Sequence, residues 1–284
     1  MNAKPFLKWA GGKTQLLSKL VALLPSKINN YYEPFLGGGA LFFELKRLNK
    51  ISGEAFLSDT NQGLVNAYKQ IRDNISKVIE CLEYHKNHHS QNYFYFARGV
   101  YNIESKDSVF SASLFIYLNK TCFNGLYRVN QSNDFNVPFG KYKNPNILDE
   151  ENLAMVSEAL QGVTIECKDF RHLYDVDFQK NDFVYFDPPY YPIDEGKSFV
   201  GYAQNGFTAK DQIELRDLCF GFAGIGTRIM LSNSDTPFTR GIYSDYNLNI
   251  KTVAASRNVN SNGNGRGKVS EIIVSLDGDR LTHD

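Results

Sequence analysis

The sequence predicts an α/β protein in which a sheet domain is split by a mostly helical insertion. Strand-like and helix-like stretches alternate near the N-terminus, and strands return after residue 161. Residues 74–161 between them have a helical pattern, broken by one polar, turn-rich stretch. A chain of 284 residues is long for one simple domain and short for two. We therefore expect a sheet domain in residues 1–73 and 162–284, and an inserted domain in residues 74–161.

The elements follow in order along the chain. "YYEPFLGGGALFFELKRL", from residue 31, has the pattern of a short strand, a turn at Gly37, Gly38 and Gly39, and a helix beginning near Ala40. "EAFLSD" is a second strand that ends at Asp59, and a second helix follows it. The remaining predicted helices are 75–85, 111–120 and 150–160, and the remaining predicted strands are 163–167, 182–187, 227–233, 247–253 and 269–275, the last two as a hairpin.

Composition indicates a globular protein, with 42% hydrophobic and 14% aromatic residues. Lys plus Arg and Asp plus Glu both number 31, so net charge gives no sign of a polyanionic partner. No signal peptide and no apolar run of about 18 residues is visible, so we expect a cytoplasmic protein without a membrane partner. The four cysteines form no CxxC pair, and the histidines of "HKNHH" fit an exposed helix face, so we expect no metal.

The glycine turn and Asp59 together point to a cofactor. Glycines after a strand let a ligand approach the backbone, and a helix N-terminus favours a negative group. The spacing is not GxGxxG, so the turn alone could be purely structural. Asp59, 20 residues past Gly39, is placed to accept hydrogen bonds from ribose hydroxyls. An adenosine-containing cofactor is therefore the better interpretation.

"WAGGKT" (9–14) resembles the tail of a P-loop, but residue 7, where the opening glycine belongs, is leucine. This argues against an ATPase or GTPase. Trp9, Lys13 and the nearby amides suit a carboxylate or a phosphate, and a plain surface turn is the alternative.

"NDFVYFDPPYYP" (181–192) carries the most specific chemistry. A nucleobase amine is a poor nucleophile, and acceptors for its two N–H groups would aim its lone pair. Asp187 and the Pro188 carbonyl can accept these bonds, because two prolines fix the turn and supply no competing N–H. Tyr190 offers a face for a flipped base. A proline-stiffened strand end with a capping acid is the alternative, and the role of "SNSD" (232–235) stays open.

These motifs carry a family resemblance over nearly the whole chain. "KWAGGK", "FLGGG" and "DPPY", in this order, resemble the Dam-type, or D12 class, N6-adenine DNA methyltransferases, and "FNGLYRVN" and "FNVPFGKY" resemble that family's DNA-recognition region. The resemblance implies a Rossmann-like, seven-stranded sheet with an inserted DNA-recognition domain. It also implies S-adenosyl-L-methionine as methyl donor and double-stranded DNA as substrate, usually at GATC.

The resemblance also implies roles for single residues. Those expected to hold the cofactor are Trp9, Lys13, Glu33, Phe35, Gly37, Gly39, Asp59, Asp169, Phe170 and Asp187. Those expected to hold the target adenine are Asp187, Pro188, Pro189 and Tyr190. After "DPPY" the family tends to continue to a serine, whereas this chain has Asp194, so that loop receives no role.

Local charge adds candidate DNA contacts despite the neutral total. Residues 246–270 hold Lys251, Arg257, Arg266 and Lys268 with no acid, and a solvated loop is the alternative. In 122–142, "LYRV" and "FNVPF" flank "NQSND" and predict a β-hairpin. The expected DNA contacts are Lys120, Phe123, Asn124, Leu126, Arg128, Asn130, Pro138, Lys141, Arg257, Arg266 and Lys268. Arg128 is the candidate reader of guanine, unless it only braces the hairpin.

We therefore expect an S-adenosylmethionine-dependent DNA N6-adenine methyltransferase that flips its target base and transfers the methyl group directly, without a metal. Cytosine N4, an RNA base and a glutamine side chain are alternative acceptors, since acid-Pro-Pro-aromatic motifs serve them all. A catalytically silent DNA-binding module is a further alternative, disfavoured because the motifs and Asp187 are intact. A cognate restriction endonuclease, without a stable complex, is a candidate partner.

Overall fold

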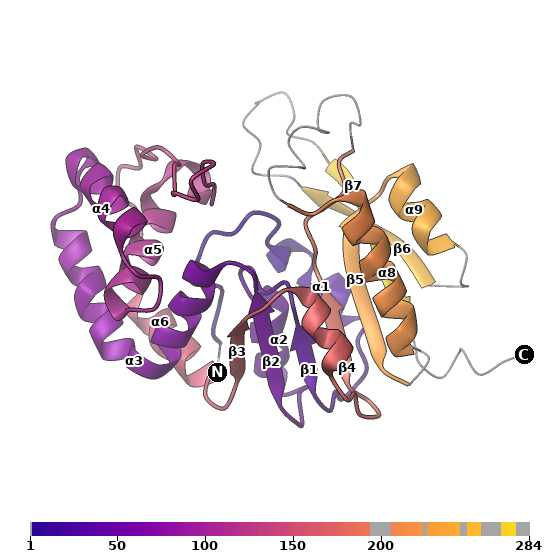
Figure 1. Ribbon diagram of the computed structural model, residues 1–284. Helices are drawn as coiled ribbons and strands as arrows, with labels where there is room; N and C mark the ends of the chain where they lie inside the picture. Colours follow the sequence, from indigo (N-terminus) through magenta and orange to yellow (C-terminus); the bar gives the residue numbers. More distant parts are fainter. Residues whose placement is uncertain (1, 194–205, 224–225, 245–248, 257–267, 277–284) are drawn as a thin grey trace, which may run out of the picture. The chain divides into compact units, whose positions relative to one another are not determined.

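The computed structural model describes residues 2–193, 206–223, 226–244, 249–256 and 268–276 (Figure 1). Within these residues, seven strands form a sheet with the order β3-β2-β1-β4-β5-β7-β6. β2, β1, β4 and β5 run parallel, and β7 is antiparallel to both β5 and β6. The strands are β1 (Tyr31–Glu33), β2 (Ala55–Asp59), β3 (Thr164–Cys167), β4 (Phe183–Phe186), β5 (Arg228–Ser234), β6 (Asn249–Ser256) and β7 (Lys268–Leu276). The predicted α/β class and seven-stranded sheet are confirmed.

The chain divides into two compact units. Unit 1 comprises Met1–Leu24, Gly37–Lys50 and Asp59–Cys167, and unit 2 comprises Pro25–Leu36, Ile51–Ser58 and Lys168–Asp284. Unit 1 contains η1 (Lys13–Gln15), α1 (Leu17–Val21), α2 (Ala40–Arg47), α3 (Gln62–Asn87), α4 (Gln91–Ile103), α5 (Val109–Thr121), η2 (Phe123–Gly125) and α6 (Glu150–Ala159). Unit 2 contains η3 (Phe170–Asp175), α8 (Ala209–Ala223) and α9 (Pro237–Ser244).

The helices of unit 1 begin where the sequence offers a cap. The side chains of Asn61, Ser90 and Ser108 accept hydrogen bonds from the first turns of α3, α4 and α5. α5 packs along α3 and is buried on nearly every face, which explains its almost continuous apolar run. α3 has non-helical backbone angles at Asn74, next to the predicted boundary at 73/74. The domain boundaries themselves remain a prediction.

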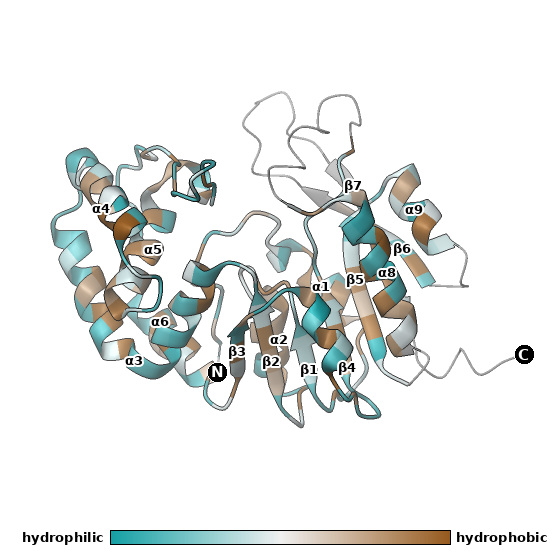
Figure 2. Ribbon diagram, viewed as in Figure 1, coloured by the Kyte–Doolittle hydropathy of each residue, from teal (hydrophilic) through white to brown (hydrophobic). Residues whose placement is uncertain are grey.

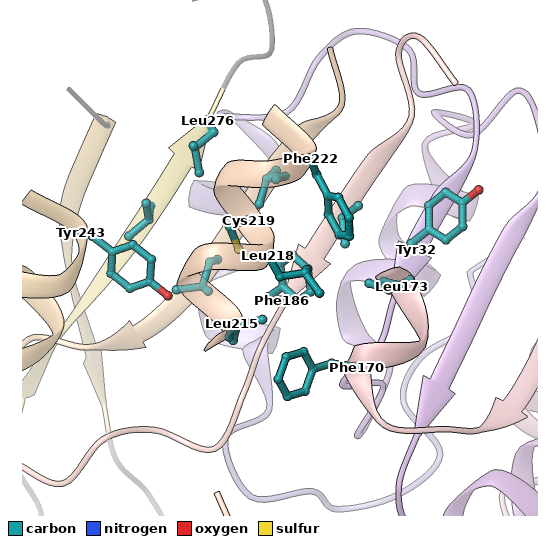
Figure 3. Packing of buried hydrophobic residues seen from close by; sticks show 14 of the residues in the cluster. Tyr32, Phe170, Leu173, Phe186, Leu215, Leu218, Cys219, Phe222, Tyr243 and Leu276 are labelled. Carbon is teal, nitrogen blue, oxygen red and sulfur yellow. The ribbon is translucent and has the colours of Figure 1, made fainter. Parts of the chain in front are cut away.

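α8 and β4 supply much of the hydrophobic core of unit 2. Leu215, Leu218, Cys219 and Phe222 of α8 gather near Phe186 of β4 in one buried cluster (Figure 3). Burying each large side chain contributes roughly 1.5–3 kcal/mol. Figure 2 shows hydrophobic residues along much of β5, whereas hydrophilic and hydrophobic residues alternate along α8. This core fixes the strand whose end carries Asp187. Among the described residues, no helix is both long and apolar enough to cross a membrane.

Candidate active site

The "DPPY" loop leaves the sheet where the strand order reverses. β1 pairs with β2 on one side and with β4 on the other, so β1 and β4 flank this switch point. Ligands of open α/β sheets bind at the carboxyl ends of strands at such a position. Glu33 ends β1, and Asp187 directly follows β4, whose four residues are all buried. Two carboxylates therefore mark the expected binding edge of unit 2.

Tyr190 is fixed by a partner that the sequence did not reveal. Its hydroxyl donates a 2.8 Å hydrogen bond to Oε2 of Glu271, a largely buried residue of β7. Burial raises the pKa of Tyr190 well above its ordinary value, and the charges of Asp187 and Glu271 raise it further. The hydroxyl therefore remains a protonated donor at neutral pH. The ring is fixed by the backbone at one end and by the hydrogen bond to Glu271 at the other.

Two other cofactor candidates of unit 2, Glu33 and Phe35, already contact neighbouring side chains. Glu33 is buried and accepts a 2.9 Å bond from the Tyr31 hydroxyl. The Phe35 ring stacks on Phe170, with 5.6 Å between centroids.

Asp169 is already engaged within the protein. Its carboxylate caps η3 through the Arg171 backbone N–H and pairs with the Arg171 guanidinium, both at 3.0 Å. A ligand at Asp169 would have to share it with Arg171.

Unit 1 brings together Trp9, the glycine turn and Asp59. Oδ2 of Asp59 accepts from the Gly37 N–H at 3.1 Å, and Oδ1 accepts from the Asn61 N–H at 2.9 Å. Burial raises the pKa of Asp59, while these N–H bonds lower it. Gly37 and Gly39 have φ of 46° and 63°, and a Cβ on Gly37 would lie 2.8 Å from Cδ1 of Trp9. The turn therefore requires glycine both for its backbone and for the space beside Trp9.

The segment from Lys4 to Lys13 is fixed by contacts within unit 1. Asn119 accepts from the Lys8 N–H at 2.9 Å and donates to the Lys8 carbonyl at 2.7 Å, and Asn152 bonds to both backbone groups of Lys4 in the same way. Lys13 is buried, and its Nζ donates to the Gly11 carbonyl at 2.6 Å. Asn119 and Asn152 lie in otherwise ordinary helical patterns, so this role could not be predicted from the sequence.

The predicted hairpin is present as isolated bridges and not as strands. Bridges join Val129 to Phe135 and Cys122 to Phe139. Asn124 and Gly125 form a turn with positive φ of 56° and 64°. Pro138 has no N–H to donate to a ladder, and the turn residues interrupt the extended backbone, which explains why the arms are irregular.

Several predicted DNA contacts also serve the hairpin itself. Arg128 Nε donates to Oδ1 of Asn136 at 2.7 Å, and Asn130 Oδ1 accepts from the Ser132 and Asp134 N–H groups at 2.9 Å. The Pro138 carbonyl accepts from the Phe123 N–H, and the Leu126 carbonyl accepts from the Cys122 thiol.

The remaining predicted DNA contacts differ in how exposed their side chains are. Phe123 is 43% exposed and Lys141 is exposed, with a positive φ of 53°. Lys120 is half-buried, and burial, with the nearby charge of Lys8, lowers its pKa. Arg257 and Arg266 lie outside the described residues, and the structure describes Lys268 only as the start of β7.

The histidine cluster corrects one expectation. His85 is fully buried and not on an exposed face, with Nδ1 2.6 Å from the Tyr93 hydroxyl and Nε2 3.0 Å from Ser113 Oγ. In the described part of the chain, no three His, Cys, Asp or Glu residues are grouped so that they could hold a metal ion.

The comparisons with known proteins agree with this arrangement. Residues 9–259 match the family model of the D12 class N6 adenine-specific DNA methyltransferases. A type II methyltransferase of Lactococcus lactis subsp. cremoris, M1.LlaDCHI, is 41% identical, covering 97% of this chain and 96% of its own. A DNA adenine methylase of Haemophilus influenzae is 35% identical, covering 96% of this chain and 94% of its own. The chain therefore belongs to the D12 class of adenine-specific DNA methyltransferases and is an enzyme.

Proposed function

We propose that this enzyme transfers a methyl group from S-adenosyl-L-methionine to N6 of an adenine in double-stranded DNA, at GATC, after the base has left the helix stack. The observation that carries the proposal is the switch point of the sheet. There, the ends of β1 and β4 present Glu33 and the sequence Asp187-Pro188-Pro189-Tyr190.

The residues assigned to the cofactor fit it within each unit. In unit 1 the two Asp59 oxygens are oriented by backbone N–H groups and keep lone pairs for ribose hydroxyls. The glycine turn is a cradle that a Cβ would fill, beside the flat ring of Trp9. In unit 2 Phe35 and Phe170 offer apolar surface, and Glu33 offers a carboxylate. When bound, S-adenosylmethionine supplies an electrophilic methyl group on a positively charged sulfur.

The chain's contribution to the reaction is mostly positioning. Asp187 accepts one N6–H bond and the Pro188 carbonyl accepts the other, which points the nitrogen lone pair at the methyl carbon. Tyr190 stacks on the extruded base, and its bond to Glu271 keeps the ring in place. The proton leaves N6 for solvent after transfer. No covalent bond between enzyme and substrate is required.

The names of relatives support adenine in DNA as the substrate and suggest a biological role. Several relatives are called DNA adenine methylases, and two, including one from Methanocaldococcus jannaschii at 40% identity, are called type II methyltransferases. We infer a role in restriction–modification, beside an endonuclease of the same site specificity that forms no stable complex with this chain.

Labelled methyl transfer tests the proposal. The protein is incubated with S-adenosylmethionine labelled in the methyl group and with GATC duplexes, duplexes lacking GATC, or RNA, and products are identified by nucleoside mass spectrometry. We expect N6-methyladenine in GATC duplexes alone. N4-methylcytosine, labelled RNA or labelled protein would each contradict it, and DNA binding without any label would indicate a silent DNA-binding module.

A further inference from the structure

The loop that carries the proposed adenine acceptors has few backbone groups that can donate hydrogen bonds to the rest of the protein. Pro188 and Pro189 have no N–H, so neither residue can donate a backbone hydrogen bond to hold the loop. The loop can be fixed only through carbonyl groups and through the residues that follow. A carbonyl used as an anchor has less capacity to accept from a substrate, so the choice of anchor matters for the reaction.

Two buried side-chain amides provide the anchor. Gln212, in the first turn of α8, donates from Nε2 to the Pro189 carbonyl at 2.8 Å. Asn233 of β5 donates from Nδ2 to Oε1 of Gln212 at 2.9 Å, and its Oδ1 accepts from the Tyr191 N–H at 3.2 Å. Both side chains are fully buried. The backbone on either side of residue 190 is therefore tied to a single chain of amides.

The direction of this chain of amides is fixed at both ends. Oδ1 of Asn233 faces two backbone donors, the N–H groups of Tyr191 and Ser234. Its Nδ2 must then face Oε1 of Gln212, which turns Nε2 toward the Pro189 carbonyl, a group that only accepts. Reversing either amide would oppose donor to donor and acceptor to acceptor in the protein interior, which would leave buried polar groups without hydrogen-bond partners.

We propose that Gln212 and Asn233 are positioning residues, which hold the Pro-Pro-Tyr loop so that the Pro188 carbonyl stays open for the adenine amino group. The Pro189 carbonyl accepts from Gln212, and the Tyr191 carbonyl accepts from Ser234 Oγ at 2.5 Å. No described residue donates a hydrogen bond to the Pro188 carbonyl between them. This inference rests on the role proposed above for Asp187 and Pro188, and it gives "SNSD" (232–235) a function.

Gln212→Glu is the variant that tests the inference. Glutamate keeps the size and the acceptor toward Asn233, but it sets a carboxylate oxygen against the Pro189 carbonyl. We expect the single-turnover rate of methyl transfer, at saturating DNA and cofactor, to fall at least about tenfold, with the dissociation constant for S-adenosylmethionine within about twofold of wild type. Asn233→Asp removes the donor to Gln212 and keeps the acceptor for Tyr191, and we expect the same split.

Gln70→Glu is a control for the chemical change itself, at a half-buried position. In unit 1, Nε2 of Gln70 also donates to a backbone carbonyl, that of Asp107, and its Oε1 also accepts from an asparagine, Asn74. The same chemical change there should leave the rate within about twofold. An equal rate loss in Gln70→Glu would overturn the inference, since it would trace the effect to general destabilisation.

Asp187→Ala, measured alongside, distinguishes the positioning role of Gln212 and Asn233 from the proposed function of the loop itself. Suppose that Asp187→Ala is inactive but Gln212→Glu keeps more than half of the wild-type rate. The positioning role is then wrong, and the proposed role of the loop stands. If Gln212→Glu does not fold, Asn233→Asp takes its place in this comparison. If Asp187→Ala is itself active, the proposed function of the loop fails.

Discussion

Arg128 is the residue of the hairpin that we expect to read the target sequence. Its planar guanidinium can pair with O6 and N7 of a guanine, yet its Nε already bonds to Asn136. We expect Arg128→Ala to cost roughly 1–3 kcal/mol at GATC and to relax discrimination at one guanine only. Methylation rates on duplexes substituted at each position of the site measure this.

Two further variants are controls for Arg128. Lys141→Ala should weaken binding to every sequence and lower the salt slope by about one charge, because we expect this exposed lysine to contact a phosphate. Asn136→Ala removes the partner of Arg128 while keeping the guanidinium. If Arg128→Ala and Asn136→Ala both slow methylation equally at all positions, Arg128 is a brace and does not read guanine.

Asp59 should affect cofactor affinity more than rate. Asp59→Ala removes the proposed ribose acceptor and its bonds to the Gly37 and Asn61 N–H groups, so we expect S-adenosylmethionine to bind at least about tenfold more weakly. The rate at saturating cofactor should fall much less. Isothermal titration checks the affinity, and an unchanged dissociation constant would remove Asp59 from the cofactor site.

At the scale of elements, the glycine turn before α2 provides a pair of adjacent substitutions. Gly37→Ala places a Cβ at φ 46° and 2.8 Å from Trp9, whereas a Cβ on Gly38 meets nothing nearer than 3.5 Å. We expect Gly37→Ala to displace Trp9 and weaken cofactor binding, and Gly38→Ala to bind normally. Tryptophan fluorescence reports the displacement, since Trp9 is the single tryptophan. Equal affinity of the two variants for S-adenosylmethionine would show that Trp9 is not needed for cofactor binding.

The packing of α3 against α5 makes unit 1 sensitive to acid. Burial lowers the pKa of His85 from 6.5 to about 4, so between these values the unfolded chain binds more protons than the folded one. The free energy of unfolding should therefore fall by about 3 kcal/mol as pH drops from above 6.5 to 4. We expect His85→Gln to lack this part of the pH dependence in urea titrations.

His88→Gln is the control for that measurement, because it removes an exposed imidazole from the C-cap of the same helix. Burial is the larger cause of the lowered pKa of His85 and the charge of His88 the smaller one, so this variant should keep most of the wild-type pH dependence. A His85→Gln slope identical to wild type between pH 4.5 and 6.5 would mean that His85 is protonated in the folded state.

At the scale of the whole molecule, catalysis on a duplex requires the base to leave the stack. 2-Aminopurine at the target position should brighten on binding, and Tyr190→Ala should brighten it further by removing the ring that quenches it. Glu271→Gln keeps a partner for the Tyr190 hydroxyl and should resemble wild type. Unchanged fluorescence with every protein, while DNA binding is shown by anisotropy, would argue against extrusion.

Prediction from sequence succeeded where the signal is local. The strand, turn and helix around Gly37, and the strand that ends before Asp187, follow from neighbouring residues and were found within a residue or two. Gln212 and Glu271 could not be found in this way, because they meet Pro189 and Tyr190 only through the packing of α8 and the order of the strands. His85 was misjudged because its pattern resembles a surface histidine, while its burial depends on α5.

The place of β7 between β5 and β6 has a consequence for how the protein is made. β6 leaves the ribosome first, but its neighbour in the sheet is β7, so it stays unpaired until residues 268–276 have been synthesised. The same residues bring Glu271 to Tyr190. A nascent chain that already contains the proposed cofactor and adenine motifs therefore lacks the contact between Glu271 and Tyr190. The enzyme should acquire activity only once residues 268–276 have been synthesised, so chains that stop before them would not methylate DNA.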